Sequence, residues 1–213
     1  MDFSDYDPSD ETPWSEAEAL TKVREFAVSF PSVELLASKN PWQVLERVSS
    51  EDPFRIRLRC VQVLRSRALL FDLEQLTLRA MGVVAIHGLH YAGEPPVAEW
   101  LDERIEEALE MLCEEDRELD RREPLERELG YPRFQLMIQV LGIEPRWARR
   151  ACIVVNDLPD RIRKTFYHLV VLRTTVNEYR ARAGTSRESV LDDLERALGS
   201  LRALGSERKG RER

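Results

Sequence analysis

The sequence has little glycine, few cysteines and no long apolar run, and each shortage excludes a class of protein. Only 9 glycines occur in 213 residues, which argues against a many-turned β-sandwich or barrel. The cysteines Cys60, Cys113 and Cys152 are far apart and match no metal-binding spacing, which favours a reducing compartment. No stretch approaches the ~18 apolar residues of a membrane span, and the acidic N-terminus does not resemble a signal peptide. We therefore expect a soluble, cytoplasmic protein that does not contact a membrane.

Signatures of catalysis and of cofactor binding are also missing. The sequence contains no glycine-rich phosphate loop, no G-x-S-x-G and no H-E-x-x-H. His87 and His90 stand close together, but zinc needs two further ligands, no partner cluster is evident and His168 is isolated. We expect no catalytic residues, no cofactor and no metal site. A helical enzyme with a site that the sequence does not reveal remains an alternative.

What the sequence has in abundance is charge and helix-forming residues. Charged residues make up 33% and hydrophobic residues 43%, and Leu, Arg, Glu and Ala dominate. The net charge of −7 argues against a general nucleic-acid binder, but it is compatible with one local basic face. These features predict an all-α protein; with the patterns along the chain described below, we expect two helical lobes joined by a charged linker and a C-terminal helix-turn-helix.

Composition shifts and turn residues divide the predicted fold. We expect a disordered acidic tail at 1–15, an N-terminal helical lobe at 16–116, a linker at 117–132, a C-terminal helical lobe at 133–205 and a disordered tail at 206–213. Between residues 97 and 128, 14 acidic side chains stand against 5 basic ones, and the simplest interpretation is a solvated helix face that continues into the linker. The predicted helices are 15–29, a short one after Pro41, then 53–69, 72–89, 97–121, 133–141, 146–155, 158–172, 175–183 and 186–204.

The last two predicted helices carry the most informative pattern. Gly184 can take the left-handed conformation that closes a helix, and Thr185 with Glu188 can cap the next one. Inward-facing positions on that next helix are expected at Val190, Leu191, Leu194 and Leu198. A helix, a tight glycine turn and an amphipathic helix occur in helix-turn-helix modules, but also in other αα-hairpins.

The wider spacing resembles the fourth conserved region of bacterial RNA polymerase sigma factors, particularly the extracytoplasmic-function group. The matching residues, in the family's order, are Leu158, Pro159, Phe166, Tyr179, Gly184, Ser186, Val190 and Leu194. The family's second region is matched more weakly by the helix Asp72–Ala80, the loop Gly93–Pro96 and the pair Trp100 and Leu101. Together the two regions cover roughly residues 54–112 and 146–204.

This resemblance implies a protein of transcription initiation or its regulation, with core RNA polymerase as the partner, promoter DNA as a second partner and an anti-sigma-like protein as a regulator. The implied polymerase-binding residues are Asp72, Glu74, Gln75 and Arg79. The implied DNA-binding residues are Arg182, Thr185, Ser186, Arg187, Ser189 and Arg196. An alternative is a sigma-like protein–protein adaptor that has lost DNA binding.

Several residues depart from the family pattern. Arg180 replaces a small residue, and Thr185 replaces an apolar one. The helix after Trp100 should present basic and aromatic groups to DNA, but its outer face is acidic at Asp102, Glu103, Glu106, Glu107 and Glu110. The C-terminal helix carries Asp192, Asp193 and Glu195 beside its arginines. We therefore hypothesise a sigma-type fold whose first lobe binds promoter DNA weakly or not at all, while the basic residues of the second lobe form either an ordinary surface or a phosphate-contacting one.

Overall fold

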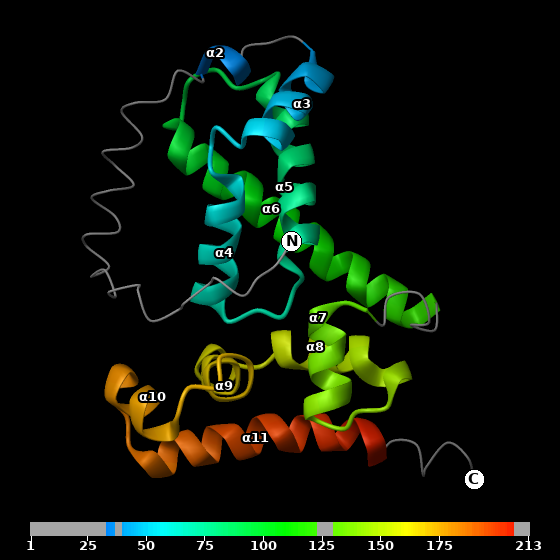
Figure 1. Ribbon diagram of the computed structural model, residues 1–213, viewed down its shortest axis with the longest axis vertical. Coiled ribbons are helices and arrows are strands. Elements are labelled where there is room, and N and C mark those ends of the chain that lie inside the picture. The colour runs from blue at the N-terminus through cyan, green and yellow to red at the C-terminus, as the bar shows by residue number, and fades with distance from the viewer. Residues whose placement is uncertain (1–32, 37–39, 123–129, 207–213) are drawn as a thin grey trace.

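A computed structural model describes residues 33–36, 40–122 and 130–206, and every regular element in these ranges is a helix (Figure 1). The all-α prediction is thus confirmed for this part of the chain. The α-helices are α2 (Val33–Leu36), α3 (Pro41–Glu51), α4 (Ile56–Arg67), α5 (Leu73–Gly88), α6 (Val97–Arg122), α7 (Pro132–Gln135), α8 (Ala148–Asn156), α9 (Asp160–Phe166), α10 (Val176–Ala183) and α11 (Arg187–Ser206). A 3₁₀ turn, η2 (Pro145–Trp147), precedes α8.

Local sequence accounts for several helix starts. Asn40 caps α3 by accepting a hydrogen bond from the backbone N–H of Trp42 at 3.0 Å, and Pro41 occupies the first turn, where its missing N–H is not needed. The carboxylate of Asp52 accepts bonds from the backbone N–H groups of Ile56 and Arg57 at 2.6 and 3.1 Å. The helix expected from 53 therefore begins only at Ile56, because Asp52 caps it from a preceding turn.

Two of the expected helices end in π-helical turns. α7 continues into η1 (Leu136–Val140), and α9 continues into η3 (Tyr167–Val171). In η3 the backbone N–H of Leu172 donates to the carbonyl of Tyr167 at 3.0 Å, which is a spacing of five residues. Each π turn inserts one residue and rotates the side chains that follow, a change that apolar periodicity does not reveal.

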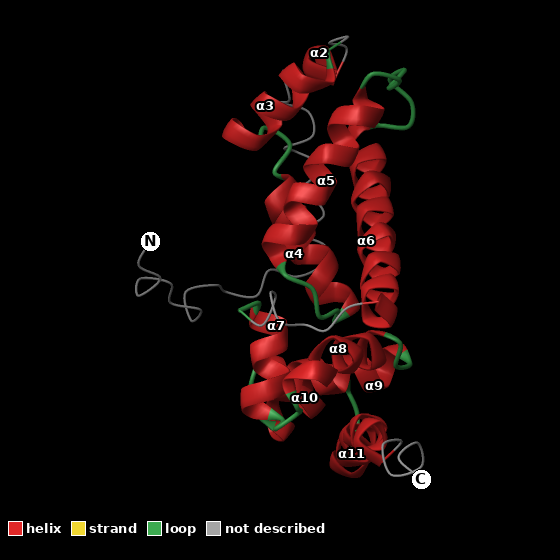
Figure 2. Cartoon of the chain, turned by 90° about the vertical axis from the view of Figure 1, so that its right-hand side faces the viewer, coloured by secondary structure: helices red, strands yellow, loops and turns green. Residues whose placement is uncertain are grey.

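Most buried hydrophobic side chains of the described residues form two clusters. Figure 2 shows the helices α2–α6 in one part of the molecule and α7–α11 in the other. The first belongs to α2–α6, and the 0% exposed residues Phe54, Leu76 and Leu101 lie in it. The second is formed mainly by α7–α11 around Phe134 and Phe166. We call residues 33–122 the N-terminal half and residues 130–206 the C-terminal half. Figure 1 shows α11 crossing the end of the molecule farthest from α2 and α3.

Some of the expected segments are only partly described. The helix expected at 15–29 and the tail at 1–15 lie outside the described residues, as does nearly all of the tail at 206–213. The expected linker began at 117, but α6 continues as one helix to Arg122, and residues 123–129 are not described. The buried stripe of α6, which includes Trp100, Ile105 and Leu112, explains why this acidic helix is long and stays packed on the first cluster.

Candidate functional site

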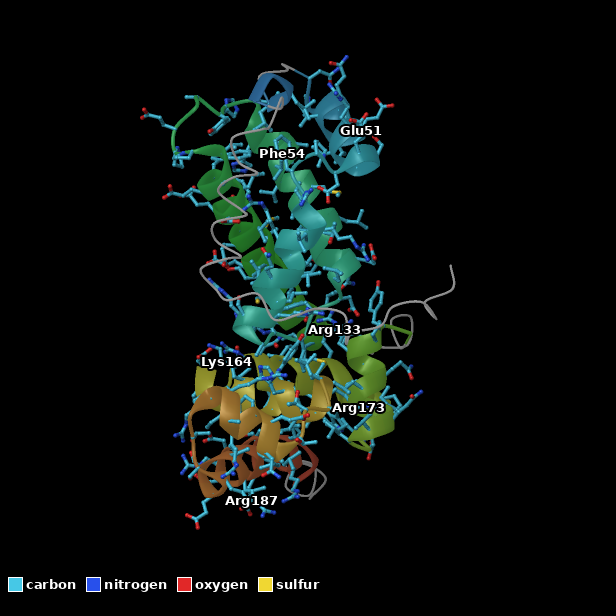
Figure 3. All side chains as sticks on the ribbon, turned by 60° about the vertical axis from the view of Figure 1, so that its left-hand side comes forward. Glu51, Phe54, Arg133, Lys164, Arg173 and Arg187 are labelled. Atoms are coloured by element: carbon cyan, nitrogen blue, oxygen red, sulfur yellow. The ribbon has the colours of Figure 1, made fainter. Side chains whose placement is uncertain are left out.

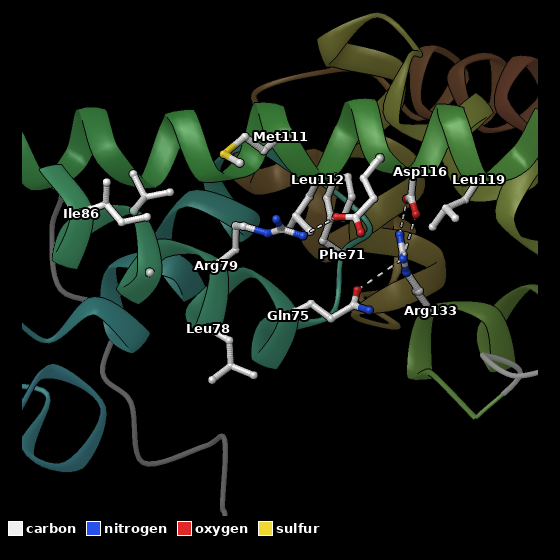
Figure 4. A pocket seen from close by; sticks show the side chains of 13 residues that line it. Phe71, Gln75, Leu78, Arg79, Ile86, Met111, Leu112, Asp116, Leu119 and Arg133 are labelled. Atoms are coloured by element: carbon white, nitrogen blue, oxygen red, sulfur yellow. Dashed lines mark hydrogen bonds and ion pairs between the residues drawn. The ribbon is translucent and has the colours of Figure 1, made fainter. Parts of the chain in front are cut away.

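A groove runs between α5 and α6 on the surface of the N-terminal half (Figure 4). Its volume is about 480 Å³. Three large apolar side chains along it are unusually exposed: Leu78 at 66%, Ile86 at 62% and Met111 at 41%. We call it the α5 groove; its lining is Phe71, Gln75, Leu78, Arg79, Gly82, Val83, Ile86, Met111, Leu112, Glu115, Asp116, Leu119 and Arg133.

The sequence of α5 explains why this surface is apolar. Leu76, Ala80 and Val84 point into the first cluster at helical spacing. Leu78 and Ile86 lie eight residues apart on another face, and a Cβ added to Gly82 between them would touch nothing within 4 Å. A helix that is apolar on more than one face needs a second partner for that face, or leaves it exposed as an interaction surface.

The four residues implied as polymerase contacts lie in or near the α5 groove, but they differ in burial and in their partners. Glu74 is exposed and pairs with Arg57 at 2.5 Å. Arg79 lines the groove and pairs with Glu115 on α6 (Figure 4). Gln75 is half-buried, and its side-chain oxygen accepts a bond from Arg133 at 3.4 Å.

Asp72 lies in the interior, which its implied role as a surface contact did not anticipate. Only 7% of its side chain is exposed, and Oδ2 lies 2.9 Å from Nε of Arg133. The pair is an ion pair without a well-directed hydrogen bond, because both Asp72 oxygens lack a hydrogen-bond donor. Burial raises the pKa of Asp72, and the positive charge of Arg133 opposes that rise.

Arg133 forms the centre of this buried charge cluster. Its guanidinium binds Asp116 through both terminal nitrogens, one of them 3.1 Å from Oδ1, and its side chain is 5% exposed. The ring of Phe134 lies 4.5 Å from its central carbon, and that of Phe71 lies 5.2 Å from it. Burial alone would lower the pKa of Arg133, but the bond to Asp116 raises it, so the side chain stays charged.

A second candidate region lies where α10 meets α11, and we call it the Gly184 corner. Gly184 has φ 62° and ψ 31°, the left-handed conformation expected from the sequence, and its N–H closes α10 by donating to the carbonyl of Arg180. Thr175 and Glu178 form a complete capping box at the start of α10. α10 and α11 are therefore separate helices.

The cap of α11 differs from the expectation. Ser186, not Thr185, caps the helix: its Oγ accepts a bond from the backbone N–H of Ser189 at 3.1 Å. Thr185 instead donates its backbone N–H to the carbonyl of Arg180 at 3.2 Å as part of the turn. Because the turn after Gly184 uses the backbone of Thr185, the cap moves one residue along, and the expected capping box with Glu188 is wrong.

The residues implied as DNA contacts also differ in exposure and in their partners. Arg182 and Arg187 are exposed, and neither has an ion-pair partner among the described residues. Ser189 is half-buried and accepts a bond from Arg161 at 3.4 Å. Arg196 pairs with Asp192 on the next turn back at 2.9 Å, so its charge is already matched.

Basic side chains gather around the Gly184 corner. Arg180 is exposed near the end of α10, whereas the exposed Arg173 precedes its start; like Arg182 and Arg187 they make no ion pair within the described chain, and Figure 3 labels Arg173, Arg187 and Lys164 in the C-terminal half. Burial lowers the pKa of His168, and the positive charges of Arg182 and Lys164 lower it further.

The outer face of α11 beyond the corner carries both charges. Val190, Ala197 and Leu201 are buried, whereas Leu191, expected to face inward, is 44% exposed. Asp193 is 2% exposed and pairs with Arg161 at 2.7 Å. The exposed charged residues of α11 are Arg187, Glu188, Asp192, Glu195, Arg196 and Arg202, whose formal charges cancel. α11 thus keeps a free face, but not a basic one.

The remaining chemistry-bearing residues have structural partners. His87 lies 3.0 Å from Arg104 and 3.3 Å from Glu107, and no group of three His, Cys, Asp or Glu in the described ranges is arranged to hold a metal ion. Burial raises the pKa of Cys60 and Cys152 to about 12, so both thiols are protonated at neutral pH.

Sequence reasoning missed the residues that join these regions. Arg133 was only the expected start of a helix, and nothing local marks it as the partner of Asp72, 61 positions earlier. Leu78 and Ile86 lie within the expected helix 72–89, and nothing in its sequence marked them individually as exposed. The exposed apolar surface of α5 could have been suspected from the sequence, because residues 72–89 are apolar at more positions than one inward face needs.

Comparison with known proteins adds no relative. No protein-family model, no curated protein and no solved structure matches the chain. Within the part of the chain that the structure describes, no helix has the length and apolar character needed to cross a membrane.

Proposed function

We propose that this chain is a sigma-factor-like transcription protein that binds core RNA polymerase through the α5 groove, and that any contact with promoter DNA is made by the Gly184 corner. In this proposal the two buried clusters are the cores of two lobes, and α10 with α11 is the helix-turn-helix. The protein needs neither catalysis nor a cofactor for this role.

The observation that carries the proposal is the Gly184 corner. Two helices meet at a left-handed glycine, and the second helix keeps an exposed face. Arg180, Arg182 and Arg187 near the turn make no ion pair within the described ranges. The guanidinium of Arg187 at the start of α11, with those of Arg180 and Arg182 at the end of α10, is suited to phosphate. Had α10 and α11 merged, or had α11 been buried on all sides, this argument would have failed.

The α5 groove supports polymerase as the partner. A strip of exposed apolar side chains runs from Leu78 to Ile86, and Gln75 at its end is polar. From Gln75 to Ile86 the helix rises about 16 Å, or three turns, which suits the apolar face of a helix from another protein. The implied contacts Glu74 and Arg79 flank this strip.

The adaptor alternative is favoured by one further observation. The outer face of α6 is acidic, with Asp102, Glu103 and Glu110 exposed, and the exposed face of α11 has no net charge. Both surfaces would bind DNA poorly. The sigma-like protein and the adaptor both require polymerase binding, and they differ in their affinity for duplex DNA.

Binding of labelled chain to core RNA polymerase tests the proposal. The double variant Leu78→Glu with Ile86→Glu should weaken binding about tenfold or more, because it places two charges in the contact. Leu58→Glu is the matched control: Leu58 is 48% exposed on α4 and does not line the groove, so binding should be unchanged. Absence of binding by the wild type, or equal binding by all three chains with unchanged helicity, would refute the proposal.

A further inference from the structure

A band of polar contacts, the seam, joins the two halves of the molecule. The backbone N–H of Leu70 donates to Oδ1 of Asn156 at 2.7 Å, and Nδ2 of Asn156 donates back to the carbonyl of Leu70 at 3.3 Å. Nε of Arg163 donates to the carbonyl of Arg67 at 2.8 Å. Two more exposed ion pairs, Arg117–Asp157 and Arg150–Asp120, cross the seam at 2.8 Å each.

Arg133 is the buried centre of the seam. It comes from α7 in the C-terminal half, and its partners Asp72, Gln75 and Asp116 all belong to the N-terminal half. Figure 4 shows its guanidinium reaching Asp116 and Gln75 at one end of the α5 groove. Two of the four residues implied as polymerase contacts are thus held by the protein's own C-terminal half.

The contacts across the seam are of a kind that allows the two halves to move apart. Of the N-terminal half, only Ala68 and Leu70 join the second buried cluster, and apart from the ring of Phe71 against Arg133 the other contacts described above are hydrogen bonds or ion pairs. Water can replace such polar contacts, and interfaces of this kind allow relative motion of the parts they join. A buried ion network fixes an orientation more than it adds stability.

We infer that the seam is a latch centred on Arg133: it opens as a unit while both halves stay folded, and its opening frees the Gln75 end of the α5 groove for a partner. The identity of that partner, core RNA polymerase, rests on the function proposed above, whereas the opening itself does not. The closed arrangement is then autoinhibitory, because the partner must displace the C-terminal half before it can use the whole groove.

Hydrogen exchange of the full chain, resolved by peptide, tests the latch. Arg133→Met leaves Asp72 and Asp116 buried without their cation, so the seam should open to hydrate them. We expect backbone amides at 68–72 and 133–135 to exchange about tenfold faster or more, while those of α5 and α11 keep their protection. Small-angle scattering should show a larger radius of gyration. Arg47→Met, which removes an exposed ion pair on α3, is the control and should change neither.

A second, milder variant distinguishes opening of the seam from a failure of the Arg133→Met chain to fold. Asn156→Ala removes two seam hydrogen bonds without leaving a charge buried, and it should accelerate exchange at 68–72 to a smaller extent. If both variants lose protection in all helices together, or if neither changes the seam amides, the latch is refuted. When binding to core RNA polymerase is measured, the Arg133→Met chain should bind more tightly than wild type. If the seam opens as expected but no chain binds polymerase, the latch stands and the proposed function falls.

Discussion

Two glycines of the C-terminal half show how one substitution can have opposite effects. A Cβ at either Gly184 or Gly199 would meet nothing within 4 Å, so steric clash plays no part. Gly184 has φ 62°, whereas Gly199 lies within α11. Gly184→Ala should destabilise the protein by about 1 kcal/mol because alanine disfavours the left-handed region, and Gly199→Ala should stabilise it by up to about 1 kcal/mol because alanine favours the helix.

Urea unfolding of the two variants beside wild type would measure these changes. Stabilisation by both variants would mean that the corner at Gly184 is not formed in solution. Because that corner carries the functional proposal, this comparison also tests whether α10 and α11 are separate helices.

Residue roles could be predicted where they depend on near neighbours. The left-handed conformation of Gly184, for example, follows from local rules. The buried position of Asp72 does not follow from them, because it depends on Arg133, and the approach of those two residues is a product of the whole fold. The cap at Ser186 was predictable only in part. Local rules predict that Thr185 or Ser186 caps α11, but the choice of Ser186 depends on the backbone turn in which Thr185 takes part.

At the scale of elements, helix positions were predictable and their irregularities were not. The apolar stripe of α6, for example, follows directly from its spacing. The π turns η1 and η3 leave no trace in periodicity because each inserts a single residue. The exposed strip of α5 was also missed, since the spacing of apolar residues does not tell a core face from a docking face.

Charges on α11 give a prediction about DNA. Asp192→Asn with Glu195→Gln removes two exposed acidic charges and releases Arg196 from its ion pair. If the Gly184 corner meets DNA, this variant should bind a labelled duplex several-fold more tightly than wild type at ~50 mM salt, and the gain should fade as salt rises. Fluorescence anisotropy at several salt concentrations measures it.

The matched control changes the same charge on another helix. Glu103→Gln with Glu110→Gln removes two exposed acidic charges from α6. An equal gain in affinity from this control would mean that net charge alone governs binding and that the corner has no special role. Tight, sequence-specific binding by wild type would contradict the weakness expected from the acidic residues.

At the scale of the molecule, charge is divided between the halves. Residues 40–122 carry 17 acidic and 11 basic side chains, whereas residues 130–206 carry 8 acidic and 13 basic ones. Opposite net charges favour the closed arrangement at low salt, and salt weakens that attraction. The fold therefore combines a basic corner, an apolar groove and a polar seam in a chain whose net charge is −7.

Competition for core RNA polymerase tests the central claim most directly. Increasing concentrations of the wild-type chain are added to core polymerase bound to a labelled housekeeping sigma factor, and the label remaining on the polymerase is measured. We expect saturable displacement by wild type and none by the Leu78→Glu, Ile86→Glu variant. If the folded wild-type chain displaces nothing and binds no free core polymerase, the sigma-like assignment is contradicted.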